Sequence, residues 1–155
     1  MSNYLDTRDL YKRQCELQEA LDTLETELED ALDDDKEMMN EQFHDNCFDQ
    51  LTLDNSKSRV SDAQKALSDW KEENQDELTE LDDLETEVGR EWMHGATLIP
   101  EDEFTAYAQD CAEDQGMDRN QPWPYSCIDW DQAADELKQD FSCCTYQGTD
   151  YFFRS

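Results

Sequence analysis

The 155-residue sequence is poor in glycine and histidine, and each shortage excludes a class of function. It has four glycines and two histidines. Loops that cradle phosphate groups need closely spaced glycines, and metalloprotease helices need paired histidines, and neither pattern occurs. A nucleophile elbow is also absent. We therefore expect no enzymatic activity, no catalytic residues and no cofactor.

Basic side chains are scarce as well, with 12 Lys and Arg against 42 Asp and Glu, which gives a formal net charge of −30. Such a surface disfavours direct binding to nucleic acid and to anionic membranes, because both depend on Lys and Arg. The chain lacks an apolar run long enough to span a membrane, and its first residues do not resemble a signal peptide. We expect a cytoplasmic protein with a basic protein as its partner.

The six cysteines include no C-x-x-C pair. An even number could form disulfides in a secreted protein, but for a cytoplasmic protein we expect free, buried thiols that behave as small apolar groups. The adjacent Cys143 and Cys144 would point to opposite faces of a strand, so at most one would face a core.

The sequence contains only weak candidates for a catalytic site or a metal site. His44 and Cys47 are close enough on a helix to touch, but an incidental pairing is favoured over a catalytic one. The acids at 33–35 and 82–83 offer oxygen ligands without the spacing of a calcium loop. We expect no dedicated metal site.

The composition changes near residue 90. Eleven of the sixteen aromatic residues lie after that point, whereas the first ninety residues contain one glycine and no proline. This contrast predicts an acidic helical domain over residues 1–90 and a small α+β domain over residues 91–155.

The N-terminal part has two heptad series. One runs from Leu17 to Ala31 and the other from Val60 to Val88, with apolar residues at alternating steps of three and four. This spacing gives a narrow apolar seam on each helix. Residues 36–57 lack it, and residues 54–56 read as a turn and helix N-cap. We predict a long antiparallel helical hairpin. A coiled-coil dimer through the same seam is the alternative, and polar Asn74 and Glu77 suggest a local opening or a register device.

The C-terminal part predicts two short helices and a β-hairpin. Pro100 is suited to the first turn of a helix that ends near Gly116, and Asp129 is suited to cap a helix over residues 130–140. Alternating residues around Gly148 predict the hairpin. The expected fold is therefore mostly α, with a small α+β module.

The C-terminal region contains several distinctive motifs. They are the segment TLIPEDEF at 97–104, Trp123-Pro124, Ile128-Asp129-Trp130, the stretch from Ala133 to Phe141, and finally Gly148, Tyr151 and Arg154. Through these motifs, residues from about 90 to 155 resemble a family of small acidic proteins of bacteriophages and prophages. The resemblance implies a phage protein acting in the cytoplasm of a bacterial host, and it implies no particular activity. In size and charge the chain is also similar to phage antirestriction and anti-defence proteins that mimic DNA.

The acids are concentrated on the two predicted helices. Residues 4–35 carry a net charge of −9 and residues 58–88 a net charge of −8. At ~1.5 Å per residue each helix would be roughly 45–48 Å long, so the pair would carry about one net charge per 2.8 Å. Duplex DNA carries about one per 1.7 Å. A pair of helices is also about as wide as a duplex.

This charge predicts a DNA-mimic inhibitor that occupies the basic nucleic-acid-binding groove of a bacterial defence or DNA-processing protein. The alternative is an acidic coiled-coil adaptor or assembly protein that binds a basic partner without mimicking DNA. Trp123 and Tyr125 would pack in the small core or add target specificity. The outward acids expected to contact the partner are Asp22, Glu25, Glu29, Asp30, Asp33, Asp34, Asp69, Glu73, Asp76, Glu80, Asp83 and Glu87.

Overall fold

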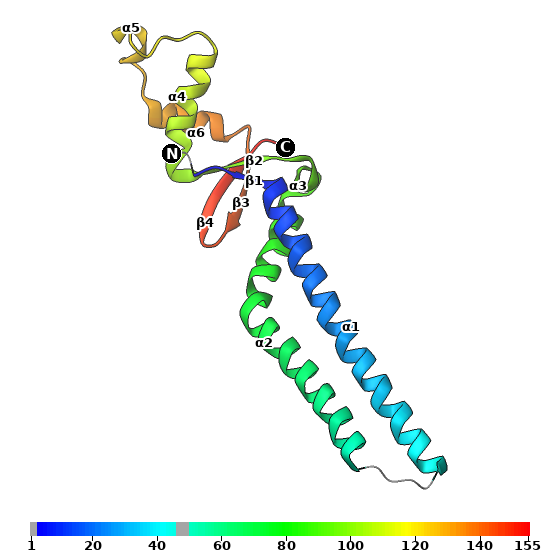
Figure 1. Cartoon of the computed structure of the whole chain (residues 1–155). Coiled ribbons are helices and arrows are strands. Elements are labelled where there is room, and N and C mark those ends of the chain that lie inside the picture. Colours follow the sequence, from blue (N-terminus) through cyan, green and yellow to red (C-terminus); the bar gives the residue numbers. More distant parts are fainter. Residues whose placement is uncertain (1–2, 46–49) are drawn as a thin grey trace. The chain divides into compact units, whose positions relative to one another are not determined.

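The computed structural model describes residues 3–45 and 50–155. It confirms the predicted fold class, with two long helices, α1 (Thr7–Asp45) and α2 (Gln50–Val88), and a small module of short helices and strands (Figure 1). Cys47 lies outside the described residues, as does the side chain of His44, so the proposed pairing of these residues remains a prediction.

The smaller elements lie before and after the two long helices in the sequence. Strand β1 comes before α1, and all the others follow α2. The chain divides into two compact units, Gln14–Thr79 and the combination of Met1–Arg13 with Glu80–Ser155. The smaller elements are β1 (Leu5–Asp6), α3 (Glu91–His94), β2 (Thr97–Pro100), a 3₁₀ turn (Glu101–Glu103), α4 (Phe104–Asp114), α5 (Pro122–Tyr125), α6 (Trp130–Lys138), β3 (Ser142–Tyr146) and β4 (Thr149–Phe153).

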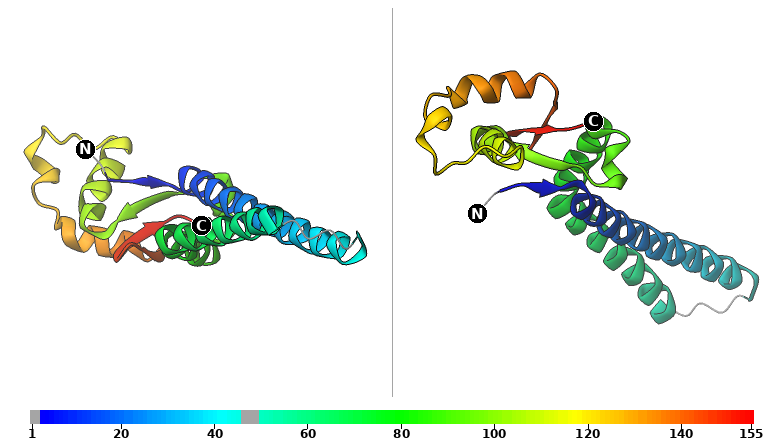
Figure 2. Two further views of the ribbon diagram at one scale, coloured as in Figure 1. Left: turned by 60° about the horizontal axis from the view of Figure 1, so that its bottom comes forward. Right: turned by 90° about the horizontal axis from the view of Figure 1, so that it is seen from above.

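The unit Gln14–Thr79 is an antiparallel pair of helices, which run side by side in all views (Figures 1 and 2). The predicted seam positions are the ones withdrawn from solvent. In this unit the half-buried or buried seam residues are Leu17, Leu21, Leu24, Leu28, Ala31, Val60, Ala63, Leu67 and Trp70. The hairpin prediction is therefore confirmed for this chain.

The predicted turn at residues 54–56 is wrong, because these residues lie inside α2. Leu53 and Ser56 are buried and continue the alternating spacing back from Val60. A serine in an apolar seam reads as a break in the pattern. In the folded chain, however, its Oγ donates a hydrogen bond of 2.6 Å to Asp35 Oδ1 on α1. The polar residue therefore has a partner across the seam and the helix continues.

The second unit is built on a four-stranded antiparallel sheet with the order β1-β2-β4-β3. The predicted β-hairpin is confirmed as β3 and β4, and Gln147 and Gly148 both have positive φ, as a two-residue type I′ turn requires. Helices α4 and α6 cover one face of the sheet, with a core of Ile99, Phe104, Ala108 and Ala134. On strands the side chains alternate, and Leu98 and Phe153 on the other face are also buried.

The start of α6 agrees with its prediction, while the region before α4 differs. The Asp129 side chain caps α6 by accepting a 3.1 Å hydrogen bond from Gln132 N. Pro100 is not in a helix but ends β2, just before the 3₁₀ turn that leads into α4. Strands β1 and β2 were not predicted, because strands of two and four residues are too short to show a period in the sequence.

The described cysteines are free, as expected, but most are not buried. Cys144 is buried and its neighbour Cys143 is exposed, so the strand separates the pair as predicted. Burial raises the pKa of the Cys144 thiol to about 12, and the nearby Glu87 carboxylate adds to this shift. Cys15 and Cys127 are exposed, which contradicts the expectation of buried thiols.

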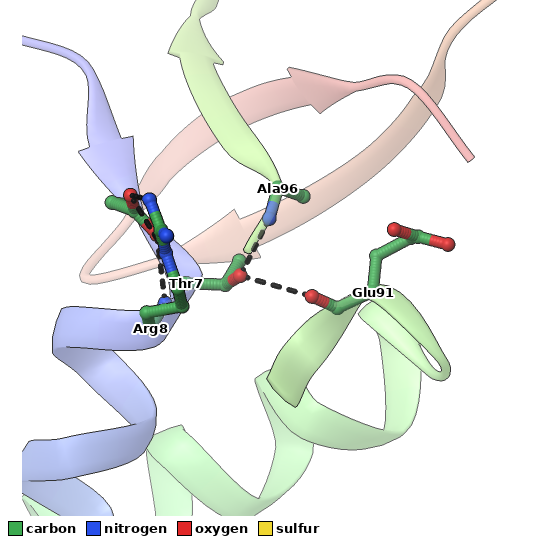
Figure 3. A network of polar contacts seen from close by, with 5 residues as sticks. Thr7, Arg8, Glu91 and Ala96 are labelled. Carbon is green, nitrogen blue, oxygen red and sulfur yellow. Dashed lines mark hydrogen bonds and ion pairs between the residues drawn. The ribbon is translucent and has the colours of Figure 1, made fainter. Parts of the chain in front are cut away.

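Thr7, at the first position of α1, is the buried polar residue that joins three elements of the second unit (Figure 3). Its side chain is 0% exposed. Its Oγ1 donates to Glu91 O at 3.1 Å and accepts from Ala96 N at 2.8 Å, and its own N–H donates to Ala96 O at 3.0 Å. The hydroxyl therefore satisfies one backbone group in α3 and one just before β2, and the Thr7 N–H adds a second bond to residue 96.

Asp6 and Arg8, on either side of Thr7, restrict which residue can occupy position 95. Asp6 accepts hydrogen bonds from the backbone and the side chain of Arg8, which lower the pKa of the Asp6 carboxyl. Arg8 in turn lies against Gly95, which has a φ of +94°. A Cβ on residue 95 would lie 2.6 Å from Arg8 Nε, so both the backbone angle and the space favour glycine there.

We predict that Thr7→Val destabilises this unit by about 1–3 kcal/mol, since it keeps the side-chain shape but leaves the buried Ala96 N–H without its acceptor. Glu91 C=O loses one of its two hydrogen bonds and keeps the one from Gly95 N–H. Thr7→Ser, which keeps the hydroxyl, is the matched control and should retain the protection of the Ala96 amide. Hydrogen exchange of that amide, together with urea denaturation, measures the effect. Equal exchange rates in the two variants would contradict the role assigned to the hydroxyl.

Candidate acidic interaction surface

The seam determines which residues of the helical pair face solvent. Positions outside the alternating three-and-four series remain exposed along both helices. All twelve acids predicted to contact a partner are exposed, six on α1 and six on α2. The structure therefore supplies the accessibility that the prediction requires, while their contact with a partner remains a prediction.

Ion pairs cross between the two long helices. Lys71 Nζ lies 3.1 Å from Glu25 Oε1, and Arg59 Nη1 lies 2.9 Å from Asp34 Oδ2. All four side chains are well exposed, so each pair contributes at most about 1 kcal/mol to stability. Together with the hydrogen bond between Ser56 and Asp35, these pairs match one antiparallel register. They help to specify how the two helices align.

Some predicted contact acids are engaged within the chain. Glu25 and Asp34 form the interhelical pairs, and Asp33 and Asp69 pair with Lys36 and Lys65 along their own helices. The hydrogen bond from Lys65 to Asp69 raises the pKa of the lysine ammonium. A basic groove would have to compete with these cations at the four positions.

Glu87 has a structural contact that the sequence did not reveal. Its Oε2 accepts a 3.1 Å hydrogen bond from the backbone N–H of Thr145 on β3. Since β3 is at the edge of the sheet, an otherwise unpaired edge amide is satisfied by a charged acceptor. No local sequence pattern indicates this contact, because 58 positions separate the two residues.

The six acids on α2 lie on one line. Their numbers differ by alternating steps of four and three, which on a helix places successive side chains one turn apart on the same face. The row spans 19 residues, and its ends are about 27 Å apart at ~1.5 Å per residue. We call it the acidic stripe, and it consists of Asp69, Glu73, Asp76, Glu80, Asp83 and Glu87.

The middle of the acidic stripe has no counter-charge. Within the part of the chain that the structure describes, Glu73, Asp76, Glu80 and Asp83 have neither a hydrogen bond nor an ion pair through their side chains. Like charges at these spacings destabilise a helix by roughly 0.2–0.5 kcal/mol per pair. The stripe therefore keeps an energetic cost that a few lysines would remove.

Polar residues in the α2 seam do not interrupt the helix. Asn74 is half-buried, and its Nδ2 donates a 3.0 Å hydrogen bond to Trp70 O within α2. Glu77 is also half-buried, and α2 continues through both positions. The acidic stripe therefore lies on one continuous helix.

The described residues offer neither a cluster of metal ligands nor a helix suited to cross a membrane. Among the side chains that the structure describes, those of residues 3–41 and 50–155, His, Cys, Asp and Glu form no group of three or more that could hold a metal ion. In the described segments, the long helices are too polar to cross a membrane.

We predict that neutralising the middle of the stripe stabilises the protein at low salt by at least about 1–2 kcal/mol, because the five like-charge pairs within the stripe are removed. The variant is E73Q/D76N/E80Q/D83N, and urea denaturation followed by circular dichroism measures its free energy of unfolding. The wild-type protein should also gain stability as NaCl is raised from 20 to 500 mM, since salt screens the repulsion. A variant less stable than wild type at 20 mM NaCl would contradict this account.

Comparisons of this chain with protein-family models, with curated proteins and with solved structures gave no significant match. The assignment of the acidic stripe as a candidate interaction surface therefore depends only on the structure of this chain.

Proposed function

We propose that the acidic helical pair acts as a surrogate for duplex DNA and occupies the basic groove of a nucleic-acid-binding protein. The acidic stripe is the observation that carries this proposal. It is exposed, it follows a single helix, and its middle carboxylates lack cations among the described residues. A surface with no other use for its charge would be more stable with lysines between the acids.

The charge density of the helical pair suits this role. The unit Gln14–Thr79 contains 21 acids and 5 bases, a net charge of −16. Over the roughly 48 Å of α1 in this unit, that is about one net charge per 3 Å, more than half the density of duplex DNA. A groove that attracts phosphates would attract this surface at long range, and added salt would weaken the attraction.

The chemistry of the carboxylates also suits a phosphate-binding groove. Carboxylate and phosphate oxygens both accept paired hydrogen bonds from an arginine guanidinium. On a preformed helix these groups need little ordering on binding, which lowers the entropic cost of the complex. Since carboxylates present none of the base edges that enzymes read in the grooves of DNA, the inhibitor would block DNA binding irrespective of sequence preference.

The setting of the proposed inhibitor follows from the resemblance of residues 90–155 to acidic phage proteins. A phage gains from disabling host proteins that bind or cut its DNA, and such proteins share basic grooves. The target class that we propose is therefore a defence or DNA-processing protein in the bacterial cytoplasm.

A second candidate is an adaptor that holds a basic partner without replacing DNA. The second unit, which combines Met1–Arg13 with Glu80–Ser155 and is called the C-terminal unit from here on, favours it through its exposed apolar side chains. Met93 and Trp123 are 59% and 76% exposed. An adaptor of this kind would depend on these residues, whereas a DNA surrogate would depend on the acidic stripe.

We predict that affinity capture from bacterial lysate recovers a basic nucleic-acid-binding protein and that the E73Q/D76N/E80Q/D83N variant binds it at least tenfold more weakly. The reason is the loss of four charges from the contact surface. The control, D102N/D135N/E136Q/D140N, removes the same charge from exposed positions of the C-terminal unit and should bind within about twofold of wild type. Duplex DNA should release the captured protein more effectively than polyglutamate of equal charge.

Equal binding by the two quadruple variants would contradict the role of the stripe. Equal release by polyglutamate and duplex DNA would show general polyanion binding in place of DNA mimicry. Loss of capture only in Met93→Ala and Trp123→Ala would favour the adaptor.

A further inference from the structure

The C-terminal unit contains a hollow of about 480 Å³ at the end of α4. Its walls come from one short stretch of chain, residues 112–124, with Met117, Trp123 and Pro124 as the larger apolar side chains. Asp118 contributes a carboxylate to the lining. Neither the helical pair nor the acidic stripe contributes to this hollow.

Backbone hydrogen bonds hold the walls in place. Gly116, with a φ of +94°, ends α4, and Met117 N donates to Ala112 O at 3.0 Å. Gln121 N donates to Asp118 O at 3.1 Å, which closes the next turn. The hollow therefore has a framework that does not depend on a ligand.

Trp123 is the most exposed of the large apolar side chains in the described chain, at 76%. Core packing of Trp123, one of the two alternatives from the sequence, is therefore wrong. Its neighbour Tyr125 is half-buried and its ring lies 4.7 Å from that of Trp130. The indole of Trp123 is thus available at the mouth of the hollow, where an apolar or cationic group can contact it.

The charges around the hollow are almost all negative. Residues 110–131 contain six acids and one base, Arg119. The Arg119 guanidinium is held by Asp110, at 3.1 Å, and by Glu113. The one cation of this stretch is therefore neutralised by two acids of α4, and the exposed Asp114 and Asp118 remain to attract a positive group.

We propose that this hollow binds an arginine or lysine side chain from a basic segment of a partner protein. The aliphatic stem would lie against Met117 and Pro124, and the cation would lie over the Trp123 indole, which is the best aromatic partner for a cation. The Asp118 carboxylate would pair with the charged head. The commitment to a basic ligand rests on charge complementarity, since a neutral apolar ligand would make no use of the acidic surroundings.

This contact is separate from the proposed DNA mimicry, because it uses residues 112–124, none of which belongs to the acidic stripe, and a single side chain of the partner. It would add a second point of attachment to the one that the acidic stripe provides. Either proposal can fail while the other holds.

We predict that a short peptide with two arginines, Ac-Gly-Ser-Arg-Leu-Arg-Ser-Gly-amide, shifts the indole N–H resonance of Trp123 in two-dimensional NMR at 150 mM NaCl. The indoles of Trp70, Trp92 and Trp130 should move much less, and Trp123→Phe assigns the signal. Trp123→Ala should weaken binding about fivefold or more, since a cation–aromatic contact and its apolar packing are lost. Met39→Ala, at an exposed apolar residue outside the hollow and outside the surface proposed for the adaptor, is the control.

The same peptide with citrulline in place of both arginines separates charge from shape and should leave the Trp123 signal in place. The proposal would be overturned if the citrulline peptide bound as well as the arginine peptide, or if all four indoles shifted together. It would also be overturned if dilution of the free protein moved the Trp123 signal as the peptide does, because the hollow would then be covered by a second copy of the chain.

Discussion

The structure depends on a narrow apolar seam that holds two strongly acidic helices together against their own repulsion. The seam of the helical pair consists of leucines, alanines and a few larger residues on one face of each helix, and every other face carries carboxylates. Hydrophobic burial favours association by roughly 25 cal/mol per Å² of apolar surface, while the unbalanced charge opposes it over a Debye length of about 10 Å at 0.1 M salt. The chain resolves this conflict by confining apolar residues to the seam and placing cations at selected flanking positions, as at Glu25 with Lys71.

A few polar side chains, in the seam and in the other unit, determine how the helices and strands align. Ser56 and Asp35 place a hydrogen bond within the seam, which would be left unsatisfied in a shifted register. In the other unit, the Thr7 hydroxyl satisfies backbone groups of two segments, and Glu87 covers an amide of the edge strand. The C-terminal unit thus contains carboxylates and hydroxyls with structural roles, whereas the middle of the acidic stripe has none that the described residues show. Some carboxylates thus bind groups of the same chain, whereas those in the middle of the stripe bind none among the described residues. This difference favours a role for the stripe in binding a partner protein.

The sequence predicts the parts of the fold that rest on local periodicity. The heptad steps of Leu17–Ala31 and Val60–Val88, the cap at Asp129 and the alternation around Gly148 all have counterparts in the structure. It fails where a residue's role is set by a distant partner. Ser56 reads as a turn because Asp35 is 21 positions away, and the short strands β1 and β2 exist only through their pairing with each other and with β4. For the candidate surface, exposure of the acids follows from the seam, but the contacts of Glu87 and the exposure of Trp123 require the tertiary structure.

The central claim is that the acidic helical pair and duplex DNA occupy the same groove, and a competition experiment with the purified partner tests it most directly. A fluorescently labelled duplex is titrated with the partner at several fixed concentrations of this protein, and the apparent Kd for DNA is measured by anisotropy. If the two ligands exclude each other, the apparent Kd rises in proportion to the inhibitor concentration without a limit. A plateau in the apparent Kd, with a ternary complex of protein, partner and DNA, would contradict the account.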